Sequence, residues 1–397
     1  MQYRENPKNR DLISQLALGC MRFERKAGRI NQTKANELVS FALEQGVNFF
    51  DTAYIYPGSE EALGIALKNS DKPRDEYKIS TKLPHYLCKS YADFDKFFEK
   101  QLKRLQAEYI DYYFIHMLNN LAALERVMSF GLENWLAEKI KDGKIKNVGF
   151  SFHGGETDFI DILNARDWDF TMVQYNYLDE NTQAGASGVR AANKKGLAVF
   201  VMAPLRGGLL ATRLPPAAKA VFLKKNPSRS MADWALRWLY NQPEITAVLS
   251  GMSSISDLKE NIISCSNISP GGLSVSELSV YQAAVAALKK SVKVPCTACG
   301  YCLPCPKGVD IPTCFNAYNE SYSVGLKIAL KQYYKNTGVA SKKQTDASCC
   351  NGCKKCERHC PQKIAIADEL IKVKKRMKTA FIMPLLRFIK KILIADN

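Results

Sequence analysis

Short apolar runs alternate with amphipathic stretches from about residue 12 to residue 290. The apolar runs have the length of buried strands, and the stretches between them carry apolar residues at helical spacing. Several of these stretches begin after Ser, Asp or Asn and end near Gly, as helix capping favours. The predicted strands cover residues 15–19, 47–51, 77–81, 112–116, 147–151, 171–175, 197–202 and 247–250, and the predicted helices include residues 33–45, 59–68, 91–105, 133–141 and 230–240.

This alternation predicts a (β/α)8 barrel, an α/β fold, over residues 1–290. An open doubly wound sheet is the alternative, but no strand–GxGxxG–helix unit near the start supports a dinucleotide fold of that type. The whole chain of 397 residues is too long for one ordinary domain. We therefore expect a second, smaller domain over residues 291–397.

Polar side chains follow three consecutive predicted strands at the point where each strand ends. Asp51 and Tyr56 follow the second strand, Lys82 ends the third, and His116 ends the fourth. Because parallel strands point their carboxyl ends at one mouth of a barrel, these four side chains are expected to converge. Taken singly, each has an ordinary structural explanation; Tyr54, His85 and His153 lie near the same ends, and we leave them out of the predicted site.

The four side chains form a coherent set for acid–base chemistry on a carbonyl group. A phenol has an ordinary pKa near 10, which is too high for efficient catalysis at neutral pH. A nearby ammonium favours the phenolate, and a carboxylate keeps that ammonium charged. Lys82 and Asp51 would tune Tyr56 as proton donor, while His116 would position the carbonyl oxygen. The predicted chemistry is carbonyl reduction or the reverse oxidation of an alcohol.

The sequence motifs around these residues resemble the aldo-keto reductase family. The resemblance rests on Asp-Thr-Ala-x-x-Tyr at 51–56, Ser-Thr-Lys at 80–82, Tyr-Tyr-Phe-Ile-His at 112–116 and further motifs up to Leu-Lys-Glu-Asn at 258–261. It implies a (β/α)8 barrel, a nicotinamide cofactor and a catalytic tetrad. By the same resemblance, the tetrad residues are Asp51, Tyr56, Lys82 and His116, the nicotinamide contacts are Ser151 and Gln174, and the adenine contacts are Glu260 and Asn261.

Three positions depart from the family pattern around the cofactor. Phe152 stands where Asn is common, Met202 stands where an aromatic ring often stacks on nicotinamide, and Asp257 lies where basic residues grip the 2′-phosphate of NADP. A carboxylate repels a phosphate. The resemblance therefore indicates NAD(P)H in general and does not indicate a preference for NADP.

Ten of the thirteen cysteines lie between residues 296 and 360, mostly in two clusters. The second cluster matches the ferredoxin-type pattern C-x2-C-x2-C-x3-C-P, and the first is one residue shorter before its last Cys. Zinc is the alternative metal for paired C-x2-C units, but zinc needs neither a third Cys in the series nor a Cys-Pro ending. We predict two [4Fe–4S] clusters, whose ligands are Cys296, Cys299, Cys302, Cys305, Cys350, Cys353, Cys356 and Cys360.

In the crossed ferredoxin pattern, three cysteines of each motif share a cluster with the last Cys of the other motif. Cys360 would complete the set of the first motif, and Cys305 that of the second. The shortened spacing leaves Cys314 as a substitute for Cys305, while Cys349 is read as a spare thiol. Residues 311–334 have a helical composition and residues 335–347 that of a polar loop, so we expect a mainly α-helical ferredoxin-type domain.

Positive charge is concentrated in the same part of the chain. Residues 289–397 carry 21 Lys and Arg against 7 Asp and Glu, out of a formal net charge of +17 for the whole chain. Part of this excess offsets the clusters, and the rest would steer an acidic electron carrier such as ferredoxin or flavodoxin. No nucleic-acid motif accompanies the charge. Residues 372–394 form a basic amphipathic stretch interrupted by Pro384, for which docking on the protein is favoured over a membrane surface.

Three functional hypotheses remain open from the sequence. The first is a carbonyl-reducing oxidoreductase whose clusters exchange electrons with a partner. The second is an electron-transfer protein whose barrel is silent or binds flavin, which joins two-electron and one-electron chemistry; the Gly-rich loop Arg206-Gly207-Gly208 hints at phosphate binding. In the third, the clusters are structural. The polar first twelve residues and the clustered cysteines indicate a cytoplasmic protein.

Overall fold

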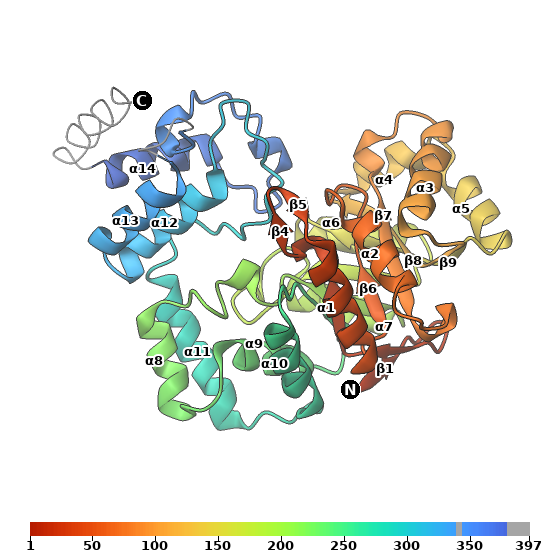
Figure 1. Cartoon of the computed structure of the whole chain (residues 1–397), viewed down its shortest axis with the longest axis horizontal. Helices are drawn as coiled ribbons and strands as arrows, with labels where there is room; N and C mark the ends of the chain where they lie inside the picture. The colour runs from red at the N-terminus through yellow and green to blue at the C-terminus, as the bar shows by residue number, and fades with distance from the viewer. Residues whose placement is uncertain (339–343, 379–397) are drawn as a thin grey trace. The chain divides into compact units, whose positions relative to one another are not determined.

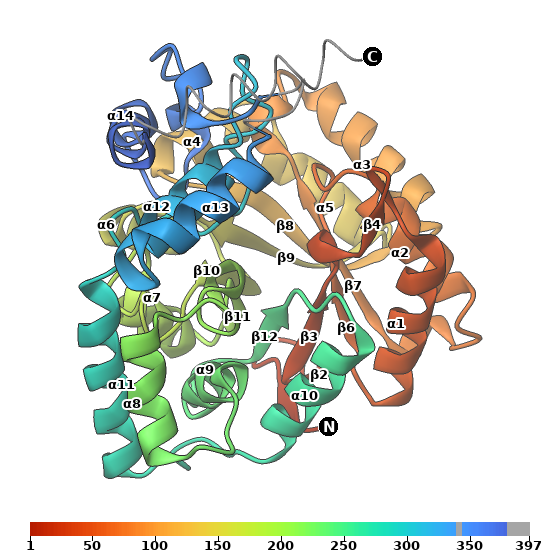
Figure 2. The same ribbon diagram turned by 60° about the vertical axis from the view of Figure 1, so that its left-hand side comes forward.

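A computed structural model describes residues 1–338 and 344–378. Eight parallel strands pair in the closed order β10-β11-β12-β3-β6-β7-β8-β9, and Figure 2 shows their labels in the same order around the barrel. The predicted (β/α)8 barrel is therefore confirmed, and so is each of its eight strands. The barrel strands are β3 (Leu16–Gly19), β6 (Phe49–Asp51), β7 (Lys78–Leu83), β8 (Ile110–Leu118), β9 (Ile145–Phe152), β10 (Phe170–Gln174), β11 (Ala198–Met202) and β12 (Ala247–Ser250).

Two short hairpins lie outside the barrel sheet and were not predicted. Strands β1 (Tyr3–Glu5) and β2 (Leu12–Ser14) pair antiparallel, as do strands β4 (Arg25–Lys26) and β5 (Arg29–Ile30). The helices follow the strands in the expected alternation (Figure 1). Between the barrel strands lie α1 (Gln32–Glu44), α2 (Ser59–Lys68), α3 (Tyr91–Leu105), α4 (Leu121–Met128), α5 (Leu132–Lys141), α6 (Glu156–Ala165), α7 (Gly185–Lys194), α8 (Pro216–Lys225) and α9 (Met231–Tyr240), followed after β12 by α10 (Ile255–Ser266) and α11 (Val275–Lys289).

The chain divides into two compact units whose boundaries do not follow one break in the sequence. The first unit comprises residues 1–205 and 232–274 and holds all eight barrel strands. The second comprises residues 206–231 and 275–397. In this second unit α8 packs beside α11, and the cysteine-rich residues lie around α12 (Ile311–Ser323), α13 (Leu326–Asn336) and α14 (Ile366–Met377).

The helical character expected over residues 311–334 is present, and the structure divides it into two helices. The first ends at Ser323 and the second begins at Leu326, with Gly325 at φ 102° between them. That dihedral lies outside the range that a right-handed helix tolerates, and Gly adopts it without a steric cost. The basic stretch predicted over residues 372–394 begins within α14, and its part beyond residue 378 lies outside the described residues.

The described part of the chain contains no helix that is both long and apolar enough to span a bilayer.

The barrel interior is filled by aromatic side chains that interlock across the strands. Phe200 is fully buried, and the centroid of its ring lies 4.6 Å from that of Phe49 and 5.8 Å from that of Phe170. Tyr112 and Phe114 of β8 complete the group. Because this core joins strands from opposite sides of the barrel, it fixes the strand ends on which the site depends.

Replacing the central ring should weaken the barrel more than replacing an exposed apolar residue. We expect Phe200→Ala to lower the free energy of unfolding by about 3–5 kcal/mol, because a buried cavity would remain. Chemical denaturation followed by circular dichroism measures this. Ile263→Ala is the control, since Ile263 is 61% exposed. A loss below about 1 kcal/mol for Phe200→Ala would show that the core does not depend on this ring.

Candidate active site

The barrel brings the four predicted catalytic residues together at the carboxyl ends of three adjacent strands. Asp51 is the last residue of β6, Lys82 lies near the end of β7, and His116 lies near the end of β8. Tyr56 lies in the turn between β6 and α2. Strand β7 pairs with both of its neighbours, so the three strand ends share one mouth. The convergence expected from the spacing is what the structure shows.

Lys82 and Asp51 form a buried ion pair at the base of this site. The Lys82 ammonium donates to the Asp51 carboxylate at 2.5 Å and to the carbonyl oxygen of Thr52 at 2.6 Å. Ser80 Oγ donates to the same carboxylate oxygen at 2.7 Å. Burial lowers the pKa of Lys82, and the negative charge of Asp51 opposes this shift. Burial likewise raises the pKa of Asp51, opposed by Lys82 and by Ser80.

Tyr56 and His116 face each other beside this ion pair. The Lys82 nitrogen lies 5.4 Å from the centroid of the Tyr56 ring, and the Tyr56 and His116 ring centroids are 6.1 Å apart at an interplanar angle of 86°. Burial, the charge of Lys82 and the neighbouring His153 and His85 hold the pKa of His116 well below its usual value. His116 is therefore a neutral imidazole near pH 7, which can donate a hydrogen bond without giving up its proton.

Two further histidines lie close enough to His116 to affect its charge, and the predicted site omitted both. His85 follows β7, and burial together with the charge of Arg126 lowers its pKa to about 4. His153 follows β9, and burial lowers its pKa to about 4, while its Nδ1 lies 3.2 Å from Gln183 Oε1. Their positions directly after barrel strands were a usable signal in the sequence. A His in such a position is nevertheless common as a packed residue.

Two tyrosines near the strand ends have different environments. Tyr54 packs edge-on against Phe97 at 4.9 Å, and the Arg104 guanidinium lies 4.7 Å from the centroid of its ring. This packing between helix side chains gives Tyr54 a structural role. Tyr86 is 42% exposed, and its ring centroid lies 6.3 Å from that of His116. No sequence pattern selects Tyr86, because it precedes no motif and ends no strand.

The residues expected to hold nicotinamide lie on the next two strands around the barrel. Ser151 Oγ accepts a hydrogen bond from the backbone nitrogen of Met117 at 2.8 Å, which leaves its own hydroxyl proton for another acceptor. Gln174 Nε2 donates to Asp179 Oδ2 at 2.9 Å, and its Oε1 accepts from Gln183 Nε2 at 3.4 Å. Both side chains are buried and held by neighbouring groups. They are thus oriented by the chain itself.

The residues expected near adenine lie on α10, after the last barrel strand. Asn261 is buried and its Nδ2 donates to Ser250 Oγ at 2.8 Å, at the end of β12. Glu260 precedes it and is partly buried. Ser254 caps the start of α10, and Asp257 lies in the first helical turn, where it accepts weak hydrogen bonds from Ser253. The departure noted at Asp257 therefore places a carboxylate at this helix start.

A small apolar-walled cavity in the second unit is lined by four of the predicted cysteine ligands. Ile311, Phe315, Ile364 and Ile366 contribute apolar walls. The four cysteines are Cys296, Cys299, Cys302 and Cys360.

Burial raises the pKa of Cys296 to about 11, and the nearby Cys299 and Cys360 raise it further because like charges repel. The last Cys of the second motif thus lies with three cysteines of the first.

The remaining predicted ligands, Cys305, Cys350, Cys353 and Cys356, have different environments. Burial raises the pKa of Cys356 to about 11, and Cys305 and Cys350 are close enough to raise it as well. Cys353 is exposed. Cys314 is fully buried and its sulfur lies 3.9 Å from the Thr345 carbonyl oxygen.

Cys349 lies near Cys305, as the effect of one thiol on the pKa of the other shows. Within residues 1–338 and 344–378, no three Cys, His, Asp or Glu side chains converge as ligands of a single metal ion.

Comparisons with known proteins agree with the geometry of the barrel. The chain is 27% identical over 300 residues to L-galactose dehydrogenase of Arabidopsis thaliana. The aligned region covers 70% of this chain and 92% of the relative. The chain is 26% identical over 316 residues to L-glyceraldehyde 3-phosphate reductase of Escherichia coli K12, with coverages of 68% and 88%.

Solved structures give the same fold. The holo form of aldo-keto reductase AKR11C1 from Bacillus halodurans superposes with a TM-score of 0.59 at 24% identity, covering 72% of this chain and 96% of that one. The thermostable aldo-keto reductase Tm1743, in complex with the inhibitor epalrestat, gives 0.58 at 25% identity, with coverages of 72% and 100%. A sequence profile of the Aldo/keto reductase family matches residues 15–270, and this chain is therefore a member of that family.

Proposed function

We propose that the barrel reduces a small carbonyl compound, or oxidises the corresponding alcohol, with a nicotinamide cofactor. The observation that carries this proposal is the buried Lys82–Asp51 pair beside the facing rings of Tyr56 and His116. Membership of an oxidoreductase family supports it. When bound, the cofactor supplies the hydride that the carbonyl carbon receives.

The chain's own side chains would manage the proton and the carbonyl oxygen. Tyr56 gives its hydroxyl proton to that oxygen, since the adjacent Lys82 ammonium stabilises the phenolate that is left. His116, held neutral by burial, donates a hydrogen bond to the same oxygen. Asp51 keeps the ammonium in place. In the reverse direction Tyr56 takes the proton from an alcohol.

Four further residues would bind the cofactor. Ser151 has a free hydroxyl proton for the nicotinamide amide, and the Gln174 amide is fixed beside it by Asp179. By resemblance to the family, Glu260 and Asn261 would contact the adenine end of the cofactor. Asp257 at the start of α10 disfavours a 2′-phosphate, so NADH is expected to compete well with NADPH.

The substrate class proposed is a hydroxylated aldehyde or its alcohol. The two relatives named for their activity are an L-galactose dehydrogenase and an L-glyceraldehyde 3-phosphate reductase, and each is covered over most of its length. Both names describe hydroxyaldehydes, the second of them phosphorylated. A panel of short sugars and hydroxyaldehydes is therefore the first choice for an assay.

We further propose that the smaller domain expected from the sequence, residues 291–397, holds two [4Fe–4S] clusters; we call this domain the tail. The fit of the residues supports this: four thiols line one apolar cavity, and Cys305, Cys350 and Cys356 are near one another. A cluster of four irons spreads its thiolates farther apart than one ion does, so a set suited to it need not resemble a single-ion site. Cys305 is proposed over Cys314, because Cys314 points at a backbone carbonyl in the core.

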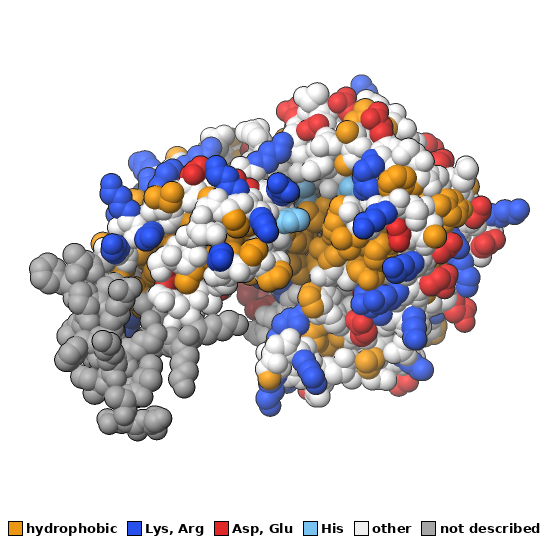
Figure 3. All heavy atoms as spheres, turned by 90° about the horizontal axis from the view of Figure 1, so that it is seen from above, with side chains coloured by type: hydrophobic (Ala, Val, Ile, Leu, Met, Phe, Trp, Pro, Cys, Tyr) orange, Lys and Arg blue, Asp and Glu red, His pale blue; other side chains and the backbone are white. Residues whose placement is uncertain are grey.

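An acidic electron carrier of the ferredoxin or flavodoxin type is the proposed partner. Five cations close in sequence to the cysteine motifs are exposed and, in the part of the chain that the structure describes, form no ion pair with a carboxylate; they are Lys307, Lys354, Lys355, Arg358 and Lys363. Unpaired cations near a redox centre steer an acidic protein toward it. In Figure 3 the left-hand part of the coloured surface carries many blue Lys and Arg side chains and few red ones.

Removing the phenolic hydroxyl tests the proposed reductase. We expect Tyr56→Phe to lower kcat for aldehyde reduction by about 10²–10⁴-fold, since the proton donor is lost, while cofactor binding is unchanged. Steady-state kinetics and a fluorescence titration with each nicotinamide measure the two effects. Tyr54→Phe is the matched control, because the Tyr54 ring packs against Phe97 and Arg104 of α3. If the wild type turns over no member of the aldehyde panel with either cofactor, the silent or flavin-binding barrel is the better reading.

Iron and sulfide analysis after anaerobic purification tests the clusters. We expect eight iron and eight sulfide per chain and a visible absorption that dithionite bleaches, since each cluster holds four of each. Cys305→Ser should lose about half of the iron, whereas Cys314→Ser should retain it. The opposite pattern would make Cys314 the ligand, and an iron-free wild type would refute the clusters altogether.

Reversing the exposed charge tests the partner. The double variant Lys354→Glu, Lys355→Glu should slow cluster reduction by reduced flavodoxin about tenfold at low salt, because steering is lost. Stopped-flow absorbance measures the rate, and the difference should shrink at high salt. Reversal of Lys219 and Lys224 on α8 is the control, and reduction by dithionite should be equal in all proteins. Equal rates with flavodoxin would rule out this surface.

A further inference from the structure

The Gly-rich loop that follows β11 in the chain is part of the cysteine-rich unit. Residues 206–231 group with residues 275–397, apart from the barrel strands. Arg206 is only 4% exposed, and its Nη2 donates to the carbonyl oxygen of Pro295 at 3.3 Å. Pro295 directly precedes Cys296. The guanidinium of Arg206 is therefore anchored at the start of the first cysteine motif.

The backbone of this loop takes an unusual path to place that side chain. Arg206 and Gly207 have φ values of 47° and 64°, both in the left-handed region. Gly207 adopts this conformation freely, whereas for Arg206 it is disfavoured and must be held by the surrounding structure. The buried guanidinium and its bond to Pro295 provide such a constraint. The loop is thus shaped around an inward-facing arginine.

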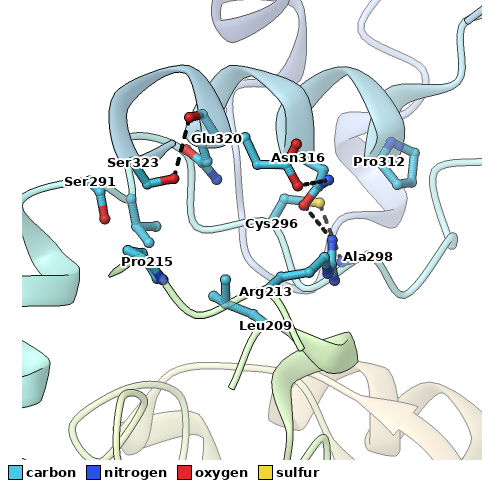
Figure 4. A pocket seen from close by; sticks show the side chains of 12 residues that line it. Leu209, Arg213, Pro215, Ser291, Cys296, Ala298, Pro312, Asn316, Glu320 and Ser323 are labelled. Carbon is cyan, nitrogen blue, oxygen red and sulfur yellow. Dashed lines mark hydrogen bonds between the residues drawn. The ribbon is translucent and has the colours of Figure 1, made fainter. Parts of the chain in front are cut away.

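A second arginine lies in the wall of a cavity that Cys296 also lines. Arg213 Nη2 donates to the Gly207 carbonyl oxygen at 2.6 Å, and its Nη1 donates to Asn316 Oδ1 (Figure 4). Asn316 Nδ2 in turn donates to Glu320 Oε1 at 2.8 Å. The cavity has a volume of about 30 Å³, enough for an ordered water among these polar groups. Arg213 is therefore fixed with its charge beside the first cysteine set.

Both arginines lie near the first cysteine set, and a cluster held there would gain negative charge on reduction. Arg206 is anchored to Pro295, directly before Cys296, and Arg213 lines a cavity that Cys296 also lines, so both charges lie beside this cysteine. A [4Fe–4S] cluster with four thiolates is anionic, and one-electron reduction adds a further negative charge. Net charge, hydrogen bonding and exposure set the reduction potential of such clusters. A buried cation near the sulfur stabilises the reduced form more than an exposed, solvated cation does.

The two cysteine sets differ in their exposure to solvent and in the burial of the cations beside them. The set with Cys296 lies in an apolar cavity with buried Arg206 nearby, whereas Cys353 of the other set is exposed among surface lysines. We propose that Arg206 and Arg213 form a cationic clamp that raises the reduction potential of the cluster held by Cys296, Cys299, Cys302 and Cys360. This inference rests on the proposed clusters. In that arrangement an electron entering at the exposed set would be drawn to the inner one.

A redox titration of the full-length, cluster-loaded protein tests the clamp. In the wild type, dithionite titration followed by visible absorption and electron paramagnetic resonance should resolve two one-electron steps. Arg206→Gln should shift one step to a lower midpoint potential and leave the other in place. Arg213→Gln should shift the same step in the same direction by a smaller amount, because Arg213 is less buried. Arg206→Lys, which keeps the charge, should restore most of the wild-type value.

Arg229→Gln is the matched control, since Arg229 lies in the same segment but pairs with Glu277. It should leave both midpoints unchanged. Iron and sulfide counts on each variant separate this inference from the proposed function. If the Arg206→Gln protein loses iron, its midpoint potentials no longer test the clamp. The shift in midpoint potential of Arg213→Gln then provides the test. Eight iron per chain with unshifted midpoints in both variants would overturn the clamp, whereas an iron-free wild type would overturn the clusters and the clamp together.

Discussion

The buried ion pair between Lys82 and Asp51 is the interaction on which the candidate active site depends. Taking two charges out of water is costly, and their attraction offsets this cost only when the geometry is good and the remaining polar atoms are satisfied. Here Ser80 donates to the carboxylate and the Thr52 carbonyl accepts from the ammonium. Removing either charge would leave the other buried without its partner. The pair is therefore better explained by a chemical role than by its net contribution to stability.

A second buried network supports the strand that carries Lys82. Gln101 of α3 donates to the carbonyl oxygen of Lys82 at 3.0 Å, and to Glu60 and Thr81 at 2.9 Å each. Arg104, also on α3, pairs with Glu60. The contacts to Thr81 and Lys82 join α3 to β7, and the contacts to Glu60 join α3 to α2. The ammonium is thus held by its backbone as well as by its counter-charge.

The combination of the two units raises a question of electron counting. A hydride carries two electrons together, while an iron–sulfur cluster passes them singly. Two clusters could between them store the electrons of one hydride, but an intermediary such as flavin is needed to separate them. The proposed asymmetry between the buried and exposed cysteine sets gives single electrons a direction within the tail. The barrel chemistry proposed here stands without that transfer.

The sequence alone predicted the barrel and the convergence of Asp51, Tyr56, Lys82 and His116, because both follow from local patterns. Eight apolar runs with capped helices between them specify the alternation, and a polar residue after a strand must lie at the mouth of a parallel barrel. The sequence puts His85 and His153 near the same strand ends, but only the tertiary structure showed that both lie close enough to His116 to affect its charge.

The same limit applies to the tail. One glycine dihedral divides residues 311–336 into two helices, and a helical composition does not reveal it. Arg206 lies 89 residues before Pro295, and its place beside the cysteines follows from packing that no local pattern encodes. Local sequence sets which elements form, whereas contacts between residues distant in the chain set which charges meet. That is the physical reason why the convergence of four polar side chains at the barrel mouth could be predicted and the environment of the cysteines could not.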